Sequence, residues 1–198
     1  MKTLKKHIAY EEKDAENTFQ RKLETASSLK LEFEKIFFEY ERLVRGIILR
    51  MGLVNEADEL TQEIFVKIWK GLENFDGRSS LKTWIYRIAH NAIHDHLRKK
   101  KRNIIFSFFG EGNRTPEKIT DDGRAEKEQS EWLREAMNQL KPELRMVLTL
   151  SYMEDLSINE IAQITGKPEG TVKSRIFHAK KMMKGILVKK GFGDFNGK

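Results

Sequence analysis

The chain has 198 residues, of which 39% are hydrophobic and 34% are charged, enough apolar content for one medium domain or two small ones. Lys and Arg number 37 against 30 Asp and Glu, and the net charge of +7 favours a polyanionic partner such as nucleic acid over an acidic small substrate. The absence of cysteine excludes disulfides, zinc–thiolate sites and thiol catalysis.

Residues 1–28 are rich in charge and only weakly periodic, which indicates an N-terminal extension before the folded part. They contain no apolar run of the length that a secretory signal needs. No stretch of the chain approaches the ~20 apolar residues of a membrane-spanning helix. We therefore expect a soluble, cytoplasmic protein with no membrane insertion.

Three helices are predicted after this extension. Apolar residues at three-and-four spacing begin at Leu31, and Gly52 stands where a C-terminal cap belongs. Asn55 is placed to cap a second helix that Gly71 closes, and the segment NFDGRSS that follows has the composition of a loop. A third helix is predicted over residues 80–100, and its last residues begin a run of cations.

Helical periodicity then fails, and the next stretch has the Gly, Pro and acidic residues of a linker. A loop of more than about 15 residues is uncommon inside one compact domain, so two domains are favoured. More helices are predicted at residues 127–140, 142–153, 158–165 and 168–188, and no strand pattern is found. The predicted fold is all-α: two small helical domains joined by a flexible linker, the C-terminal one a helix-turn-helix. The predicted boundaries are 1–28 (extension), 29–102 (first domain), 103–126 (linker), 127–190 (second domain) and 191–198 (tail).

The segment SINEIAQITGKPEGTVKSRIFHAKKMM predicts the helix-turn-helix. Ser157 and Glu160 have the spacing of a capping box, Gly166 permits the left-handed turn that stops a helix, and Pro168 suits the start of the next one. The expected buried stripe of the second helix is Val172, Ile176, Ala179 and Met183. Its expected outward residues are Thr171, Lys173, Ser174, Arg175, Phe177, His178, Lys180 and Lys181.

This outward set has the chemistry of major-groove recognition, because Lys and Arg pair with guanine and hydroxyls bond bases or phosphates. The alternative is a helical hairpin with an ordinary solvated basic face. Eight Lys and Arg against two Asp and Glu between Ser157 and Lys190 favour DNA reading.

The third helix combines aromatic, amide and basic residues. Its expected buried side includes Trp84, and the opposite side carries Thr83, Arg87, Asn91, His94 and Arg98. Unpaired bases offer faces to stack on and edges to bond, so this combination suits single-stranded DNA. Two alternatives remain for this helix, a structural role and a metal site on His90 and His94, whose spacing of four is that of paired ligands. The Glu of the zinc-protease pattern is missing and no third ligand is evident, so we expect no metal, no cofactor and no enzyme activity.

Three segments in this order resemble the extracytoplasmic-function (ECF) group of the sigma-70 family, which are sigma subunits of bacterial RNA polymerase. They are NEADELTQEIFVKIWK, FDGRSSLKTWIYRIAHNAIHDHLRKKKR, and ELRMVLTLSYMEDLSINEIAQITGKPEGTVKSRIFHAKK. The likeness covers about Leu31 to Leu187. It implies that the first domain is sigma region 2 and that the second is sigma region 4.

The resemblance implies roles for three groups of residues. Polymerase binding falls to Asp58, Leu60, Thr61, Gln62, Glu63 and Phe65. The pocket for a flipped base of the −10 element is implied at Phe75, Asp76, Gly77, Arg78, Ser79 and Ser80, with Thr83, Arg87, Asn91 and Arg98 on the adjoining helix. The −35 element is implied for Thr171, Lys173, Ser174, Arg175, Phe177, His178 and Lys181. His178 and Asp76 depart from the basic residues that are frequent at these places.

The function implied is that of a promoter-specificity subunit, which binds the β′ clamp helices and the β flap of core RNA polymerase. It would read duplex −35 DNA, melt and capture the −10 element, and start transcription of a stress or envelope-signal regulon. An anti-sigma factor is the further partner implied. The rivals are a stand-alone helix-turn-helix regulator, which leaves the helix around Trp84 unexplained, and a metal-dependent hydrolase built on His90 and His94.

Overall fold

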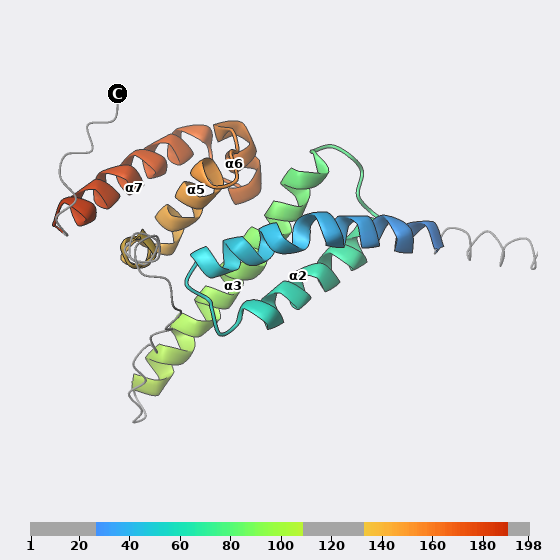
Figure 1. Cartoon of the computed structure of the whole chain (residues 1–198), viewed down its shortest axis with the longest axis horizontal. Coiled ribbons are helices and arrows are strands. Elements are labelled where there is room, and N and C mark those ends of the chain that lie inside the picture. The colour runs from blue at the N-terminus through green and yellow to red at the C-terminus, as the bar shows by residue number, and fades with distance from the viewer. Residues whose placement is uncertain (1–26, 109–132, 190–198) are drawn as a thin grey trace, which may run out of the picture.

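The computed structural model describes residues 27–108 and 133–189, and every regular element in these ranges is a helix. The first unit consists of a helix over residues 27–50, α2 (Ala57–Leu72) and α3 (Leu81–Phe108). The second unit consists of a short helix over residues 133–138, α5 (Pro142–Tyr152), α6 (Ile158–Thr165) and α7 (Glu169–Lys189) (Figure 1). The all-α prediction is confirmed. Within the described ranges, no helix is both long and apolar enough to cross a membrane.

The third helix is longer than predicted. It continues beyond Lys100 to Phe108, into the stretch assigned to the linker. The run of Lys and Arg from Arg98 to Arg102 thus belongs to the helix, because both residue types have good helix propensity. The rest of the predicted linker and both chain termini lie outside the described residues, as does the start of the helix predicted at 127–140.

Two expected helix-end signals of α2 are wrong. The N-cap position is Glu56 rather than Asn55, and no side chain bonds the free backbone N–H groups there. Gly71 lies inside the last turn instead of after it. A Cβ at this position would lie only 3.0 Å from the Trp84 ring, so glycine serves the close packing of α2 on α3.

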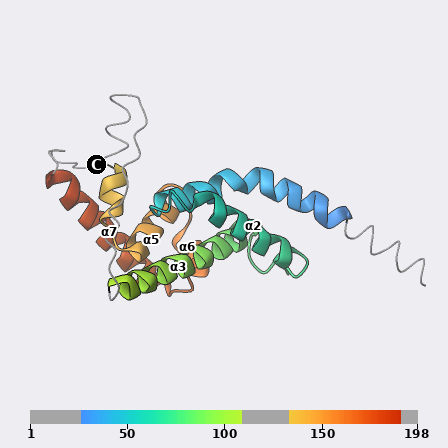
Figure 2. The ribbon, with the colours of Figure 1, turned by 90° about the horizontal axis from the view of Figure 1, so that it is seen from below.

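One apolar core extends through both units. Buried residues of the first helix, α2 and α3 pack in the same cluster as buried residues of α5 and α6, among them Leu150, Ile161 and Ile164. The contact is made chiefly by α6, which lies beside α3 in both views (Figure 2). A smaller cluster inside the second unit joins α7 to the helix over 133–138 through Ala136, Met137, Leu140, Ala179 and Met183.

A buried arginine links the two units by hydrogen bonds at a second place. Arg145 of α5 donates to the backbone oxygen of Met51 at 2.8 Å, and to the backbone oxygens of Asn138 and Leu140 at 2.7 and 3.1 Å. These carbonyls lie at or just after the C-terminal ends of two helices, where the helix dipole favours a cation. Burial lowers the pKa of Arg145. The neighbouring Gly52 adopts φ +79° as the predicted cap, and a Cβ there would approach the guanidinium to 3.0 Å.

We predict that Arg145→Leu lowers the free energy of unfolding by about 2 kcal/mol, because several hydrogen bonds from a charged donor are lost inside the protein. Urea denaturation followed by circular dichroism measures this change. Arg42→Leu on the exposed side of the first helix is the control and should change stability by less than about 0.5 kcal/mol. Equal effects of the two substitutions would contradict this role of Arg145.

Candidate nucleic-acid interface

Interactions among its own residues stabilise the loop between α2 and α3. Gly77 adopts φ +71°, a left-handed conformation that glycine permits without strain. The Asp76 carboxylate accepts from the backbone N–H of Arg78 at 3.1 Å and pairs with its Nε at 3.0 Å. Asp76 and Arg78 are both exposed, so this ion pair shapes the surface of the loop and leaves guanidinium donors free to face a ligand.

Ser80, expected in the loop, caps α3 through Thr83, which was expected on the outward side of the helix. The Ser80 hydroxyl accepts from the backbone N–H of Thr83 at 3.1 Å and lies 2.8 Å from the Thr83 hydroxyl. Thr83 is buried, so in this arrangement its side chain is structural and cannot contact DNA. The sequence placed it on the outward side because helical spacing alone does not reveal a capping contact.

The aromatic residues of the loop and helix pack on each other. The rings of Phe75 and Trp84 lie 5.0 Å apart, both half-buried. Trp84 also fills the space left by Gly71 on α2. Trp84 of α3 therefore contacts both the loop, through Phe75, and α2, through Gly71. Ser79 of the same loop is half-buried.

The outer side of α3 carries the expected polar series. Arg87, Asn91 and Arg98 are exposed at helical spacing on one side of the helix. The Asn91 side-chain oxygen lies 3.1 Å from Nδ1 of His90, and Arg98 pairs with Asp95 at 3.1 Å. The side chains can donate to phosphates and to base edges, which is the chemistry required of a single-strand surface.

The helix-turn-helix forms as the sequence predicts. Ser157 and Glu160 make both bonds of the capping box, and Gly166 caps α6 with φ +63°. The two bonds to Ser157 lower the pKa of Glu160. Pro168 precedes α7 by one residue, and its carbonyl accepts from Thr171 and Val172. These contacts lie within a few residues of each other, so they could be read from spacing alone.

The second helix of the helix-turn-helix, α7, exposes most of the residues expected on its outward side. Lys173, Ser174, Phe177, His178 and Lys181 are exposed, while Thr171 and Arg175 are half-buried. The Phe177 and His178 rings lie 5.8 Å apart. Five side chains are therefore available to a major groove in this arrangement.

The expected polymerase residues divide into buried and exposed ones. Leu60 is a core residue and cannot meet a partner, because the apolar side of α2 faces the first helix and α3. Thr61 is buried and bonds the Ala57 carbonyl at 2.7 Å. The exposed members are Gln62, Asp58, which pairs with Arg45, and Glu63, which pairs with Lys67 at 2.7 Å.

Phe65 lies in an apolar groove between the first helix and α2, with a volume of about 530 Å³. Three further aromatic residues line it that the sequence analysis did not single out: Phe33, Phe37 and Trp69. The Phe33 and Trp69 rings are 5.1 Å apart, and Val66 is 45% exposed beside them. The signal in the sequence was Val66 and Trp69 on the otherwise polar side of α2.

A second apolar groove of about 690 Å³ lies on the helix-turn-helix unit. Its apolar lining includes Leu148, Tyr152 and Val188, and the cations Lys180, Lys181 and Lys184 line it as well. The Lys180 ammonium lies 5.2 Å from the centre of the Tyr152 ring. Each unit thus has one apolar groove open to a partner.

A third, polar cleft of about 500 Å³ separates α3 from α5 and α7. Asn91, His90 and His94 line it from α3, and Arg175 and Lys167 line it from the helix-turn-helix unit. Burial lowers the pKa of His90, and the nearby His94, Arg175 and Lys167 lower it further. Asp95 and Glu143 also face this cleft. The two expected DNA surfaces therefore meet at one place.

The structure gives the histidine pair no further ligands. The His90 and His94 rings lie 5.9 Å apart. In the part of the chain that the structure describes, no group of three or more His, Cys, Asp or Glu could hold a metal ion.

Comparison with known sequences gives matches to both units. The family profile described as Sigma-70 region 2 matches residues 36–103, and the one described as Sigma-70, region 4 matches residues 130–183. The RNA polymerase sigma-H factor of Pseudomonas aeruginosa is 35% identical, over 75% of this chain and 82% of that protein. The ECF RNA polymerase sigma factor SigW of Bacillus subtilis is 31% identical, over 77% of this chain and 87% of that protein.

Two solved structures share the fold. The sigma factor RpoE in complex with the anti-sigma factor NepR, from Bartonella quintana, has a TM-score of 0.66 at 22% identity, over 79% of this chain and 96% of that chain. CnrH in complex with the cytosolic domain of CnrY has a TM-score of 0.61 at 19% identity, over 81% of this chain and 90% of that chain.

We predict that acid weakens the packing around His90. Because the pKa of His90 is lower in the folded than in the unfolded chain, the neutral ring contributes stability above about pH 6.5 that is lost as the pH falls through the folded-state pKa. Arg175→Gln should raise the pKa of His90, measured by NMR titration of the imidazole, because a facing cation is removed. Lys173→Gln, on an exposed position of the same helix, should leave it unchanged. A His90 pKa that ignores Arg175→Gln would contradict the facing arrangement.

Proposed function

This chain belongs to the ECF group of the sigma-70 family, the promoter-specificity subunits of bacterial RNA polymerase, and we propose that its two basic surfaces read the two elements of one promoter. In this proposal α7 enters the major groove of the −35 element. The loop of Phe75 to Ser80, with Asn91 on α3, captures a flipped base of the −10 strand. The observation that carries the proposal is a separate DNA-compatible surface on each unit of a single chain.

The chemistry of each surface suits its element. On α7, Lys173 and Ser174 offer donors to guanine and phosphate, and the exposed Phe177 offers an apolar contact to a thymine methyl group. At the loop, extrusion of a base costs a few kcal/mol, which a shaped pocket beside cations can offset. Phosphate contacts dominate such binding, so the free protein should bind DNA weakly and salt should weaken it further.

The two apolar grooves are the proposed sites for polymerase. The groove of Phe33, Phe37 and Trp69, which Asp58 and Gln62 also line, fits a helix of the β′ clamp. The groove on α5 and α7, rimmed by lysines, fits the β flap. Catalysis in this proposal belongs to the polymerase, and the chain acts with it in the cytoplasm.

An anti-sigma factor is the proposed regulator. A sigma factor of similar fold is seen with the anti-sigma factor NepR, which supports a partner of this class. The proposed output is a stress or envelope-signal regulon, switched on when the anti-sigma factor is removed. The stand-alone regulator remains a weaker alternative, because it gives the aromatic groove and the α3 surface no role.

We predict that the purified chain, added to core polymerase on a pool of genomic promoters, yields discrete run-off transcripts that core alone does not. Asn91→Ala should lower their amount about tenfold or more, because a lost base contact costs about 1–3 kcal/mol. Binding to core polymerase should be unchanged. Asn55→Ala, at an exposed position before α2, is the matched control. Failure of the wild-type chain to bind core or to start any transcript would refute the proposed function.

We also predict that Val66→Glu weakens binding to core polymerase about tenfold or more, because it places a charge in the aromatic groove. Phe38→Glu is the control: Phe38 is 83% exposed and lies outside the groove. The affinity is measured by fluorescence anisotropy of labelled chain with core polymerase. An equal loss for both variants would argue that the whole apolar surface, rather than the groove, makes the contact.

A further inference from the structure

The polar cleft between α3, α5 and α7 is a cavity to which the proposed function gives no ligand of its own. Its volume of about 500 Å³ is typical of small-molecule sites. His90, Asn91 and His94 line it from α3, and Lys167 and Arg175 line it from the helix-turn-helix unit. All of these side chains except Asn91 are cations or become cations in acid. The cleft therefore has the composition of an anion site.

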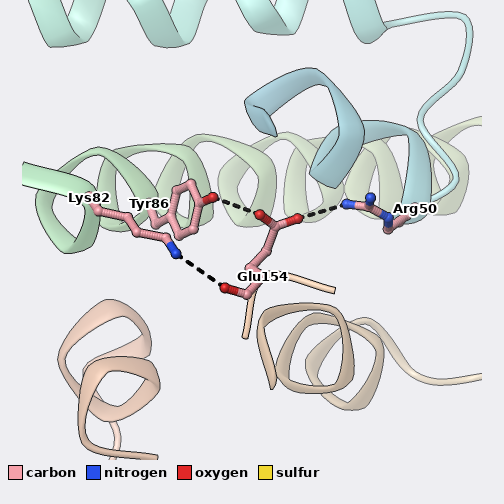
Figure 3. Close-up of polar contacts among 4 residues, drawn as sticks. All are labelled: Arg50, Lys82, Tyr86 and Glu154. Atoms are coloured by element: carbon pink, nitrogen blue, oxygen red, sulfur yellow. Dashed lines mark hydrogen bonds and ion pairs between the residues drawn. The ribbon is translucent and has the colours of Figure 1, made fainter. Parts of the chain in front are cut away.

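Hydrogen bonds between the two units hold the walls of this cleft in place. Glu154, in the loop between α5 and α6, has a side chain that is 3% exposed. Its carboxylate oxygens accept from Nη1 of Arg50 at 2.8 Å and from the Tyr86 hydroxyl at 2.6 Å (Figure 3). Met51 lines the cleft itself, and its backbone oxygen accepts from Arg145 at 2.8 Å. A cavity whose walls are fixed in this way loses little conformational entropy when a ligand binds.

The two permanent cations of the cleft have no acidic partner. Arg175 is half-buried, and Lys167 is exposed in the turn between α6 and α7. Among the described residues, no carboxylate lies within ion-pair distance of either side chain. Asp95 also lines the cleft, but its carboxylate pairs with Arg98 at 3.1 Å. Glu143 is the other carboxylate in the described lining, so the two cations outnumber the unpaired acid.

The electrostatics at His90 show the same excess of positive charge. Burial is the main cause of its lowered pKa, and the charges that lower this pKa further are those of His94, Arg175 and Lys167. No carboxylate of the described residues offsets them at the ring. An anion in the cleft would supply this missing counter-charge.

We propose that the cleft binds a small ligand through a phosphate group, which Arg175 and Lys167 contact from one side and His90 and His94 from the other. A phosphate offers acceptor oxygens to all four side chains, and the guanidinium can bind it with two hydrogen bonds. The ligand is either the free phosphate ion or a nucleotide. In the proposed function Arg175 contacts DNA, so the ligand and the −35 element would compete for one guanidinium. This consequence rests on the proposed function, whereas the site itself can be tested without it.

The test is an NMR titration of the full chain with inorganic phosphate, at an ionic strength kept constant by replacing sodium chloride. The imidazole resonances of His90 and His94 should move and saturate. Phosphate should also raise the pKa of His90, because a bound anion favours the charged imidazole. His96 and His178 do not line the cleft and are internal controls, so their resonances should stay in place.

Substitutions around the cleft should change the affinity for phosphate in opposite directions. Lys167→Gln should weaken binding about tenfold, because a hydrogen bond from a charged donor is lost. Glu143→Gln should tighten binding, because it removes a carboxylate that repels the anion. Lys173→Gln removes an exposed cation of α7 outside the cleft and should leave the affinity for phosphate unchanged.

Further titrations with ATP, and with adenosine as a control that lacks phosphate, distinguish the two sources of the phosphate group. Binding of ATP about tenfold or more tighter than phosphate would identify a nucleotide site, and equal affinities would identify a site for the ion itself. The proposal is overturned if the shifts of His90 and His94 do not saturate, if chloride produces the same shifts, or if Lys167→Gln binds phosphate as wild type does. A chain that binds phosphate but starts no transcript with core polymerase would refute the proposed function alone. A chain that starts transcripts but does not bind phosphate would refute this site alone.

Discussion

The packing of α6 against α3 is the contact on which the rest of the arrangement depends. It joins the apolar residues of the two units into one core, and the polar contacts at Glu154 and Arg145 flank it. Apolar packing gives the contact area but little direction. The hydrogen bonds fix the relative position of the two units, because a buried carboxylate or guanidinium is stable only where its hydrogen-bond partners are in reach. One helix is thereby held at one place on α3.

The proposed partner surfaces and the proposed DNA surfaces lie differently with respect to the contact between the units. The grooves around Trp69 and Tyr152 are each lined by residues of one unit alone. Asn91 of α3 and Arg175 of α7 instead line one cleft that both units share. Other residues of α7, among them Lys173 and Phe177, are exposed in the same arrangement.

Local features of the fold could be predicted, and distant contacts could not. The capping box at Ser157 and the turn at Gly166 depend on residues a few positions apart, and spacing was enough. Tyr86 bonds a residue 68 positions away and Arg50 one 104 positions away, so no periodic pattern marks them. Leu60 and Thr83 were assigned to surfaces, Leu60 by the resemblance and Thr83 by helical spacing, and neither source shows that both residues are buried in the folded chain.

The contact of Gly71 with Trp84 has a consequence for how the first unit responds to its partners. The α2 helix, which carries the groove proposed for polymerase, packs through Gly71 on Trp84 of α3, and Trp84 in turn contacts Phe75 of the loop proposed to capture a base. In the proposed function, a shift of α2 on binding polymerase would be transmitted to this loop. Thermodynamic linkage would make the effect reciprocal: DNA of the preferred sequence would tighten the binding to polymerase by the same factor by which polymerase tightens the binding to DNA. A matching promoter would thus prolong the residence of the subunit on the enzyme, and a mismatched one would let it leave.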